Sequence, residues 1–247
     1  MPIDKNSLTI IDSMDSTNNY AMGLINAGLA KHGSAFFAME QTQGKGRLSK
    51  AWASEKGKNI LLSIIINPTI LTLARQFELS VAISLACVDF LKIYVDDLAI
   101  KWPNDIFWND RKAGGILIEN VIQGKIWKWS VLGIGINVNQ TKFNVNGNFL
   151  PVSLKQITGK DFDIIILANE LRNAILKRYE SLENPSGFNA MLIEYNQLLF
   201  GLGKKVRLKK GNAVFETTVQ SVSSNGRLAT KDTLEREFDF NEIEWIR

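Results

Sequence analysis

The sequence predicts an α/β (α+β) protein with a mixed, largely antiparallel sheet, followed by a small C-terminal β-barrel. Three observations favour this class: strand-like apolar runs, a few long segments with helical spacing, and a change to short alternating strands near Gly201. The 247-residue chain has 45 % hydrophobic and 22 % charged residues, which is typical of a globular protein and not of a disordered one. We expect two domains, residues 1–198 and 199–247.

The N-terminal part predicts three strands and one helix. The helix is expected at Thr17–Ala27, with Ser16 able to cap its first turn and Gly28 placed to end it. The expected strands are Leu8–Met14, Ser34–Glu40 and Asn59–Asn67. A glycine-rich cationic loop, Gln41–Trp52, separates the last two strands.

The central part predicts a long helix, four antiparallel strands and two further helices. Ala74–Tyr94 has apolar residues at helical spacing, and Asn109–Arg111 has the composition of a turn. The expected strands are Ala99–Trp102, Ile106–Trp108, Gly115–Val121 and Ile126–Asn139, and the helices are Ile164–Tyr179 and Phe188–Asn196. Beyond Gly201, we expect the strands Lys204–Leu208, Phe215–Val222, Arg227–Thr230 and Glu235–Asp239, which predict a small barrel.

The rarest residues exclude several kinds of chemistry. Cys87 and His32 are the single cysteine and the single histidine. An intrachain disulfide and a zinc site of three or four Cys/His ligands are therefore excluded, and a Ser-His-Asp triad would have to use His32. No apolar run is long enough for a membrane helix, and no signal peptide precedes the first strand. We expect a soluble, cytoplasmic protein with no membrane partner.

The cationic loop is the first segment with chemistry of its own. It combines two glycines, three cations and an aromatic residue: Gly44, Gly46, Lys45, Arg47, Lys50 and Trp52. Glycines let backbone N–H groups approach a ligand, so the set suits a polyphosphate or an acyl phosphate attached to an aromatic base. A solvated basic loop is the alternative. No P-loop is present, and Ser49 stands where a G-x-G-x-x-G fingerprint needs glycine.

Three further segments carry residues that could contact a ligand. Pro103 cannot lie inside a central strand, so it predicts a strand end that presents Asn104 and Asp105. Asp105 could hold Mg²⁺ or orient an amine, and Asn104 could contact a base; an Asx turn is the alternative. Lys112 precedes small residues that would let a carboxylate or phosphate approach it, unless it is a surface hairpin lysine. Asn137 lies on a glycine-rich strand that suits a flat ligand.

Taken in order, these motifs resemble those of the biotin–protein ligase (biotin–[acetyl-CoA-carboxylase] ligase) family. The matching segments are residues 15–18, 41–52, 101–105, 111–119 and 133–137. The resemblance implies a catalytic domain similar to class II aminoacyl-tRNA synthetases, followed by an SH3-like barrel. It also implies a two-step reaction. ATP and biotin form biotinyl-5′-AMP, and biotin then passes to a lysine of a biotin carboxyl carrier protein.

The resemblance also implies the site residues. Biotin contacts fall on Ser16, Thr17, Asn18, Gln41, Gly44, Lys45, Gly46, Arg47, Lys112 and Gly115. ATP contacts fall on Arg47, Lys50, Trp52, Asn104, Lys112 and Asn137. Lys112, Arg47 and Asp105 are the implied catalytic residues, with Asp105 near Mg²⁺ or the incoming lysine. We hypothesise that Lys112 bridges the biotin carboxylate and the α-phosphate.

Departures and rival functions complete the sequence-based expectations. The family loop usually runs G-R-G-R-x-G-R-x-W, whereas Lys45, Ser49 and Lys50 replace two arginines and a glycine here. Lysine keeps the charge and loses the bidentate fork. Only fifteen residues precede Ser16, so we expect no DNA-binding winged helix. A lipoate/octanoate–protein ligase, a nucleic-acid-binding protein and a biotin-binding module are the alternatives. We expect no nucleic-acid partner, and a homodimer is possible.

Overall fold

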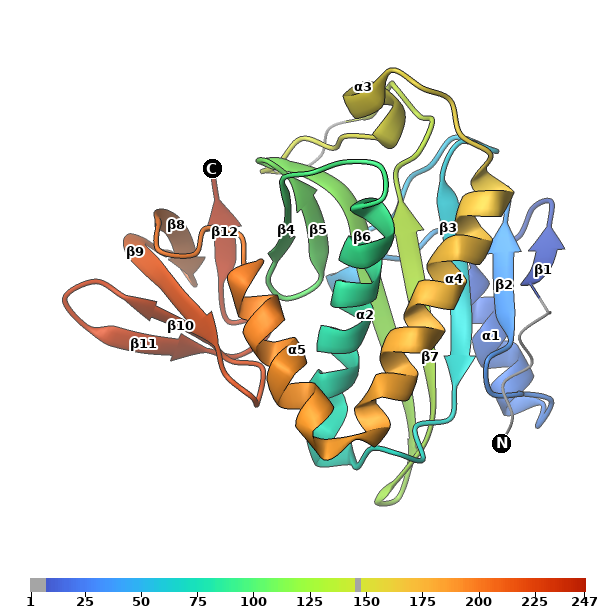
Figure 1. Cartoon of the computed structure of the whole chain (residues 1–247), viewed down its shortest axis with the longest axis horizontal. Coiled ribbons are helices and arrows are strands. Elements are labelled where there is room, and N and C mark those ends of the chain that lie inside the picture. Colours follow the sequence, from blue (N-terminus) through green and yellow to red (C-terminus); the bar gives the residue numbers. More distant parts are fainter. Residues whose placement is uncertain (1–7, 145–147) are drawn as a thin grey trace.

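The computed structural model describes residues 8–144 and 148–247, which form two β-sheets (Figure 1). The larger sheet has seven strands in the order β1-β2-β3-β7-β6-β5-β4, and the smaller has five in the order β11-β10-β9-β8-β12. The larger sheet consists of β1 (Leu8–Ile11), β2 (Ala35–Ala38), β3 (Ile60–Ile66), β4 (Leu98–Lys101), β5 (Asp105–Trp108), β6 (Arg111–Gln123) and β7 (Ile126–Ile136). The smaller consists of β8 (Lys205–Lys210), β9 (Ala213–Val222), β10 (Leu228–Lys231), β11 (Glu235–Phe238) and β12 (Glu244–Ile246).

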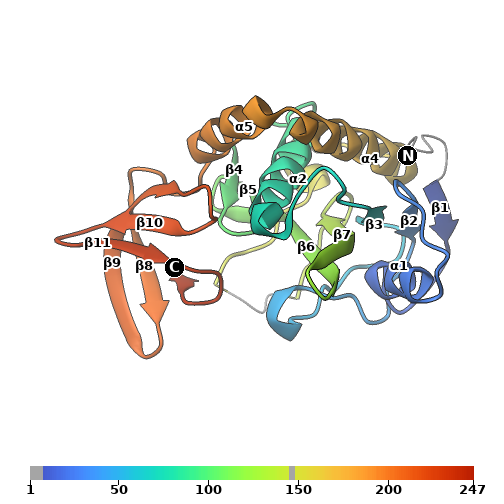
Figure 2. The ribbon, with the colours of Figure 1, turned by 90° about the horizontal axis from the view of Figure 1, so that it is seen from below.

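Helices cover both faces of the larger sheet. The α-helices are α1 (Thr17–Asn26), α2 (Gln76–Leu91), α3 (Leu154–Thr158), α4 (Ile164–Glu180) and α5 (Pro185–Gln197), and short 3-10 turns are η1 (Arg47–Ser49), η2 (Leu73–Arg75) and η3 (Ser181–Glu183). Figure 2 shows α2, α4 and α5 on one face, with α1 on the opposite face. No helix in the part of the chain that the structure describes has the length and apolar character needed to cross a bilayer.

Strand β3 explains why the sheet is buried from both sides. All seven of its residues are buried, and successive side chains point to opposite faces. Leu62 and Ile64 pack into the large core beneath α2 and α4, whereas Ile65 packs with Ala21 and Ile25 of α1. The continuous apolar run Ile60–Ile66 is therefore a central strand, and Ser63 is its one polar residue.

The predicted sheet type is confirmed. β1 pairs with β2 in parallel, and every other pair in the larger sheet is antiparallel. The longest pairing joins β6 to β7, and it places Gly115 opposite Gly135 and Leu117 opposite Gly133. This hairpin brings three glycines of distant sequence segments to one patch of the sheet, where side chains from other elements can approach the backbone.

The predicted elements all exist, with ends displaced by a few residues, and besides the 3-10 turns one α-helix and one strand were not predicted. These are α3, which has a Ser153–Gln156 capping box, and the three-residue strand β12. The predicted side-chain cap at Ser16 is wrong. Ser16 occupies the N-cap position but its side chain makes no capping bond. The N–H of the next residue, Thr17, donates instead to a side chain outside the helix, Gln41 Oε1, at 2.7 Å.

The smaller sheet is open among the described residues, with β11 and β12 at its edges, so the predicted closed barrel is not confirmed. It packs against the larger sheet through a shared apolar core that includes Leu208, Val219 and Trp245. The connecting segment covers the edge strand β4: Ile100 N–H donates to Leu198 O at 2.7 Å, and Phe200 N–H donates to Ile100 O at 2.9 Å. The chain thus protects an edge that would otherwise offer free hydrogen-bonding groups.

Candidate functional site

A cleft on the α1 face of the larger sheet gathers most of the predicted site residues. Its walls are α1, the 41–52 loop and the start of β6, and strands β3, β6 and β7 form its floor. The predicted residues that line it are Ser16, Thr17, Asn18, Gln41, Lys45, Gly46, Arg47, Trp52, Asn104, Asp105, Lys112 and Gly115. Segments separated by up to a hundred positions in the sequence therefore meet in one cavity.

One end of the cleft, which we call the polar end, is a hydrogen-bond network of buried hydroxyls and amides that ends on the Glu119 carboxylate. Gln41 Oε1 accepts from both the N–H and the hydroxyl of Thr17, at 2.7 and 2.9 Å. Ser63 Oγ lies 2.7 Å from Thr17 Oγ1 and 2.6 Å from Asn18 Oδ1. Asn18 Nδ2 donates to Glu119 Oε2 at 2.6 Å. The orientations of these amides and hydroxyls are thus fixed before any ligand enters.

The other end, which we call the cationic end, surrounds one carboxylate with basic groups. Lys112 Nζ lies 2.6 Å from Asp105 Oδ1, and Lys101 Nζ lies 3.8 Å from Asp105 Oδ2. Arg47 Nη1 donates to Asn104 Oδ1 at 3.1 Å and Nη2 donates to Asn241 Oδ1 at 2.7 Å. Burial lowers the pKa of Arg47, and Asp105 opposes that shift. The net charge of this end is positive, as binding of an anion requires.

Lys101 lies behind the cleft in an aromatic cage. Its Nζ is 4.9 Å from the ring centroid of Phe149 and 5.5 Å from those of Phe107 and Trp245. Burial lowers its pKa to about 8, although Asp105 favours the charged form. The three rings supply cation–π attraction in place of the water that the ammonium has lost.

The Trp52 ring packs against the glycine patch on the floor of the cleft. A Cβ at Gly135 would come within 2.5 Å of its ring, and a Cβ at Gly115 within 3.2 Å. Lys112 Nζ is 5.6 Å from the ring centroid. The Trp52 Nε1 is buried and has no hydrogen-bond partner among the described residues. The glycine-rich strand predicted to receive a flat ligand thus carries an aromatic ring of the chain itself.

The cationic loop is folded back on itself and attached at both sides. Gly46 N–H donates to Lys50 O at 2.7 Å, and Trp52 N–H donates to Gly44 O at 2.9 Å. Leu48, between these pairs, has a left-handed φ of 53°. Lys45 Nζ donates to Asn19 Oδ1 of α1 at 2.5 Å, whereas Arg47 reaches the opposite wall. The loop therefore spans the mouth of the cleft.

Three predicted site residues do not line the cleft. Gly44 is buried beneath the loop, where a Cβ would lie 2.3 Å from Trp52 O, and Lys50 is exposed. Asn137 is buried and donates to Lys112 O and Val152 O, both at 3.2 Å. Its side chain is committed to the backbone beside Lys112, whose N–H also donates to Leu150 O at 2.8 Å. Asn137 thus fixes the main chain of Lys112, and its proposed contact with the nucleotide stays a prediction.

The residues around Asp105 do not fit a resident magnesium site. No group of three or more His, Cys, Asp or Glu residues in 8–144 and 148–247 could hold a metal ion. Asp105 is a single carboxylate already flanked by Lys101 and Lys112, and these cations would repel a divalent ion. The expectation that Asp105 holds Mg²⁺ is therefore not supported.

Sequence reasoning missed the apolar floor of the cleft and four side chains that bond to or pack on its lining. Ser63 and Glu119 complete the polar end; Ser63 had a signal, as the one polar residue of an apolar strand, whereas Glu119 lies in a strand with several polar residues. Asn241 and Phe240 reach Arg47 from the smaller sheet, and no local pattern identifies them.

Comparison with known proteins identifies the family. The family model for the biotin/lipoate A/B protein ligase family matches residues 10–137. A biotin–[acetyl-CoA-carboxylase] ligase of Paracoccus denitrificans is 30 % identical over 221 residues, covering 87 % of this chain and 90 % of that protein. The bifunctional ligase/repressor BirA of Bacillus subtilis is 30 % identical over 223 residues, covering 88 % of this chain and 67 % of that protein.

Solved structures share the fold over nearly the whole chain. The biotin protein ligase from Aquifex aeolicus, in complex with biotin and ATP, matches with a TM-score of 0.81 at 24 % identity, covering 98 % of this chain and 99 % of that one. The family model covers more than half of the chain and the sequence matches agree with it, so the chain belongs to the biotin/lipoate A/B protein ligase family.

Proposed function

We propose that the chain is an ATP-dependent biotin–protein ligase and that the cleft holds both biotin and ATP. The observation that carries this proposal is the contrast between the two ends of the cleft. Biotin has a neutral polar ring at one end and a carboxylate at the other. The polar end offers hydrogen bonds from Thr17, Asn18 and Gln41, and the cationic end offers Arg47 and Lys112.

In the first step, the biotin carboxylate attacks the α-phosphorus of ATP, and pyrophosphate leaves. The carboxylate is already a nucleophile, so no histidine base is needed. The barrier arises from bringing an anion to a polyanion, and fixed cations lower it. We assign this role to Lys112, whose Nζ reaches the cleft beside Asp105, and to Arg47 on the facing loop. We propose that Trp52, Asn104 and the more exposed Lys45 and Lys50 contact the nucleotide.

In the second step, a lysine amine of the acceptor attacks the acyl carbon of biotinyl-5′-AMP. The C–N bond forms, the C–O bond to AMP breaks, and the amine loses a proton. We propose a biotin carboxyl carrier protein as the acceptor, with Asp105 receiving its amine at the cationic end. Mg²⁺ is proposed to enter with the ATP phosphates as part of the substrate, because one Mg²⁺ commonly binds substrate phosphates and few protein ligands.

We propose different roles for the two parts of the chain that contain the two sheets. We assign the biotin and ATP site to residues 1–198, and we propose that this part resembles class II aminoacyl-tRNA synthetases because its sheet is largely antiparallel and covered by helices. We propose that residues 199–247 form an SH3-like unit on the basis of its five short antiparallel strands. A homodimer would pair through β1, the uncovered edge of the larger sheet.

The test is biotin-dependent ATP–pyrophosphate exchange with Mg²⁺. We expect exchange with biotin and its loss, by at least a hundredfold, in Lys112→Met, because one oxyanion-stabilising donor is typically worth about 3–4 kcal/mol. Lys128→Met is the matched control, since Lys128 is an exposed lysine of β7 outside the cleft. Exchange with lipoate or octanoate in place of biotin would move the chain to the lipoate branch. Exchange with none of these acids would contradict the proposal.

A further inference from the structure

A turn of the smaller sheet between β11 and β12, residues 239–242, reaches the loop that lines the cleft. Two of its side chains reach Arg47. Asn241 Oδ1 accepts from Arg47 Nη2 at 2.7 Å, and the guanidinium carbon lies 5.6 Å from the centroid of the Phe240 ring. Arg47 is otherwise held in the cleft by Asn104, at 3.1 Å. Its two terminal nitrogens are therefore divided between the two sheets.

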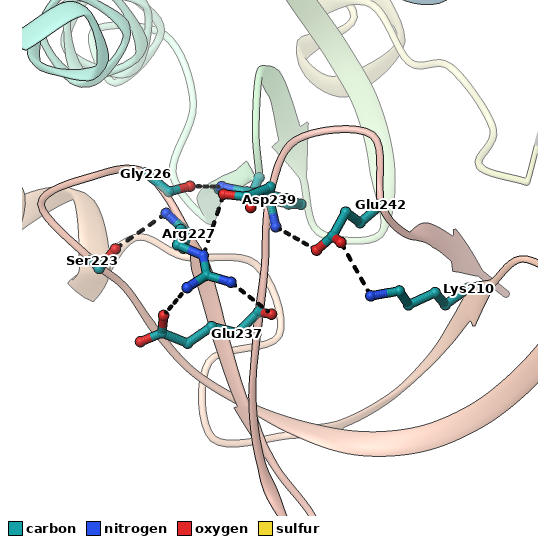
Figure 3. Close-up of polar contacts among 8 residues, drawn as sticks. Lys210, Ser223, Gly226, Arg227, Glu237, Asp239 and Glu242 are labelled. Carbon is teal, nitrogen blue, oxygen red and sulfur yellow. Dashed lines mark hydrogen bonds and ion pairs between the residues drawn. The ribbon is translucent and has the colours of Figure 1, made fainter. Parts of the chain in front are cut away.

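The turn is itself fixed by charged contacts within the smaller sheet (Figure 3). Asp239 Oδ1 lies 3.3 Å from Arg227 Nε, and Arg227 Nη1 donates to Glu237 Oε2 at 2.8 Å. Glu242 closes the turn by accepting from Asp239 N–H at 2.9 Å, and its other oxygen accepts from Lys210 Nζ at 3.1 Å. The turn is thus held at both of its ends.

Apolar packing joins the same turn to the larger sheet. The Phe240 ring lies 5.5 Å from that of Trp102 and 6.0 Å from that of Phe77. Trp102, which belongs to the 101–105 segment, donates from its Nε1 to Gly226 O at 2.9 Å in a buried hydrogen bond. The position of the turn relative to the cleft is therefore set by groups on both sheets.

Asn241 combines two properties that suit a contact of this kind. Its φ of 72° is left-handed, a conformation that asparagine adopts more readily than most residues. That backbone aims the carboxamide at Arg47. The opposite side of the guanidinium is bonded to Asn104, whose Nδ2 donates to Ile116 O at 2.7 Å. Both acceptors are neutral, so they orient Arg47 without cancelling its charge.

We propose that Asn241, supported by Phe240, is a positioning residue for Arg47, and that the smaller sheet thereby takes part in adenylate formation. The inference rests on the proposed function of the cleft. The backbone hydrogen bonds of the loop fix the main chain of Arg47, but its long side chain has several rotatable bonds, so the position of the guanidinium depends on the groups that bond it. A guanidinium held from both walls loses less freedom when phosphate arrives, which favours the transition state.

The test compares Asn241→Gly with Asn241→Asp. Glycine accepts the left-handed φ and removes the acceptor, whereas aspartate keeps an acceptor oxygen. We expect Asn241→Gly to lower kcat/KM for ATP in biotin-dependent exchange by about tenfold or more, as loss of one hydrogen bond to a charged group predicts. Asn109→Gly is the matched control, because Asn109 is an exposed turn residue with a φ of 51° outside the cleft.

A double-mutant cycle separates positioning from a general structural effect. In an Arg47→Lys background, Asn241→Gly should cause no further loss, because its partner has already gone. Additive losses, or equal activities of Asn241→Gly and the unmodified chain, would overturn the proposal.

A second readout does not depend on activity. Trypsin should cleave after Arg47 several times faster in Asn241→Gly than in the unmodified chain, Asn241→Asp or Asn109→Gly, with the site located by mass spectrometry. Equal cleavage rates would overturn the proposal even if exchange is never observed. Absence of exchange in the unmodified chain would instead contradict the proposed function, so the two failures are distinguishable.

Discussion

The polar and cationic ends of the cleft are built in different ways. At the polar end, Thr17, Asn18 and Ser63 are at most 4 % exposed, and the network joins α1, the 41–52 loop and strands β3 and β6. At the cationic end, Arg47 and Lys112 are partly exposed, and their contacts come from a loop, a hairpin and the smaller sheet. The larger sheet and the segments around it thus build the polar end alone, whereas the cationic end also takes a contact from the smaller sheet.

Burial energetics account for this difference. A buried neutral group costs little once it is hydrogen-bonded, so hydroxyls and amides can be enclosed in the sheet. A buried charge is costly even when it is paired, and this cost shifts the pKa of the buried group so that its neutral form is favoured. Lys101 is the one lysine of the cationic end that the sheets enclose, and burial lowers its pKa to about 8. This contrast can be tested at both ends.

The largest expected effect concerns Lys101 and pH. Its pKa is about 8 in the folded state against a model-peptide value of 10.5, so between these values the unfolded state binds more protons and folding stability rises with pH. Below pH 8 both states are charged, and burial of the ammonium costs about 3 kcal/mol in full. Lys101→Met removes this cost, so below pH 8 the variant should be more stable than the unmodified chain. The difference in their unfolding free energies should shrink by about 3 kcal/mol from pH 8 to 10.5.

Urea denaturation of both proteins at pH 7.5, 9 and 10.5 measures this change. The Lys128→Met variant serves as the reference for an exposed lysine. If the unfolding free energies of the unmodified chain and Lys101→Met change in parallel with pH, burial does not disfavour the charged form of Lys101, and the contrast between the two ends is wrong.

The next effect tests the polar end through Gly133→Ala. The added methyl group would lie 2.3 Å from Asn18 Oδ1, and the carboxamide cannot move without losing its bonds to Ser63 and Glu119. Overpacking of this kind costs about 2 kcal/mol. We therefore expect a lower midpoint of thermal unfolding and a biotin Kd raised at least tenfold, measured by calorimetry. Unchanged biotin affinity would show that Asn18 is not a ligand contact.

Gly135→Ala tests the cationic end in the same way, two residues along β7. Its methyl group would lie 2.5 Å from the Trp52 ring, but that ring belongs to a loop and can move. We expect a stability loss of about 1 kcal/mol, with a raised KM for ATP and little change in biotin affinity. Gly23→Ala is the control, because nothing lies within 4 Å of its Cβ position. Equal stability losses at both glycines would show that the two ends are equally rigid.

The same contrast explains which parts could be predicted from the sequence. Ser16, Thr17 and Asn18 are consecutive, and Gln41–Trp52 and 101–105 are short continuous motifs, so their meeting in one cleft follows from local patterns and the family resemblance. The strands were predicted because burial on one or two faces leaves a period in the sequence. Helix α3 did have a signal, its Ser153–Gln156 capping box, but five residues are too few for a periodic pattern.

What could not be predicted depends on contacts between distant segments. Asn137 was expected to face a nucleotide, but its amide donates to the backbone at Lys112 and Val152, a pairing that only the meeting of β7 with residues 150–152 reveals. Asn241 lies 194 positions from Arg47. Nothing in its local sequence, an ordinary polar turn, indicates a contact with the cleft. Motifs identify the groups present, and the tertiary fold decides which group each one faces.

The smallest expected effect concerns the attachment of the loop to α1. Lys45 Nζ donates to Asn19 Oδ1 at 2.5 Å, and Asn19 in turn donates to Asp15, whose pKa this bond lowers. Lys45 is exposed, and exposed contacts of this kind contribute about 0.5 kcal/mol. Asn19→Ala should therefore raise the rate at which biotinyl-5′-AMP escapes only two- to threefold, measured by filter retention of labelled adenylate. The effect should vanish in a Lys45→Ala background and shrink at high salt. An increase of tenfold or more would mean that the α1 side, and not the Arg47 side, holds the loop closed.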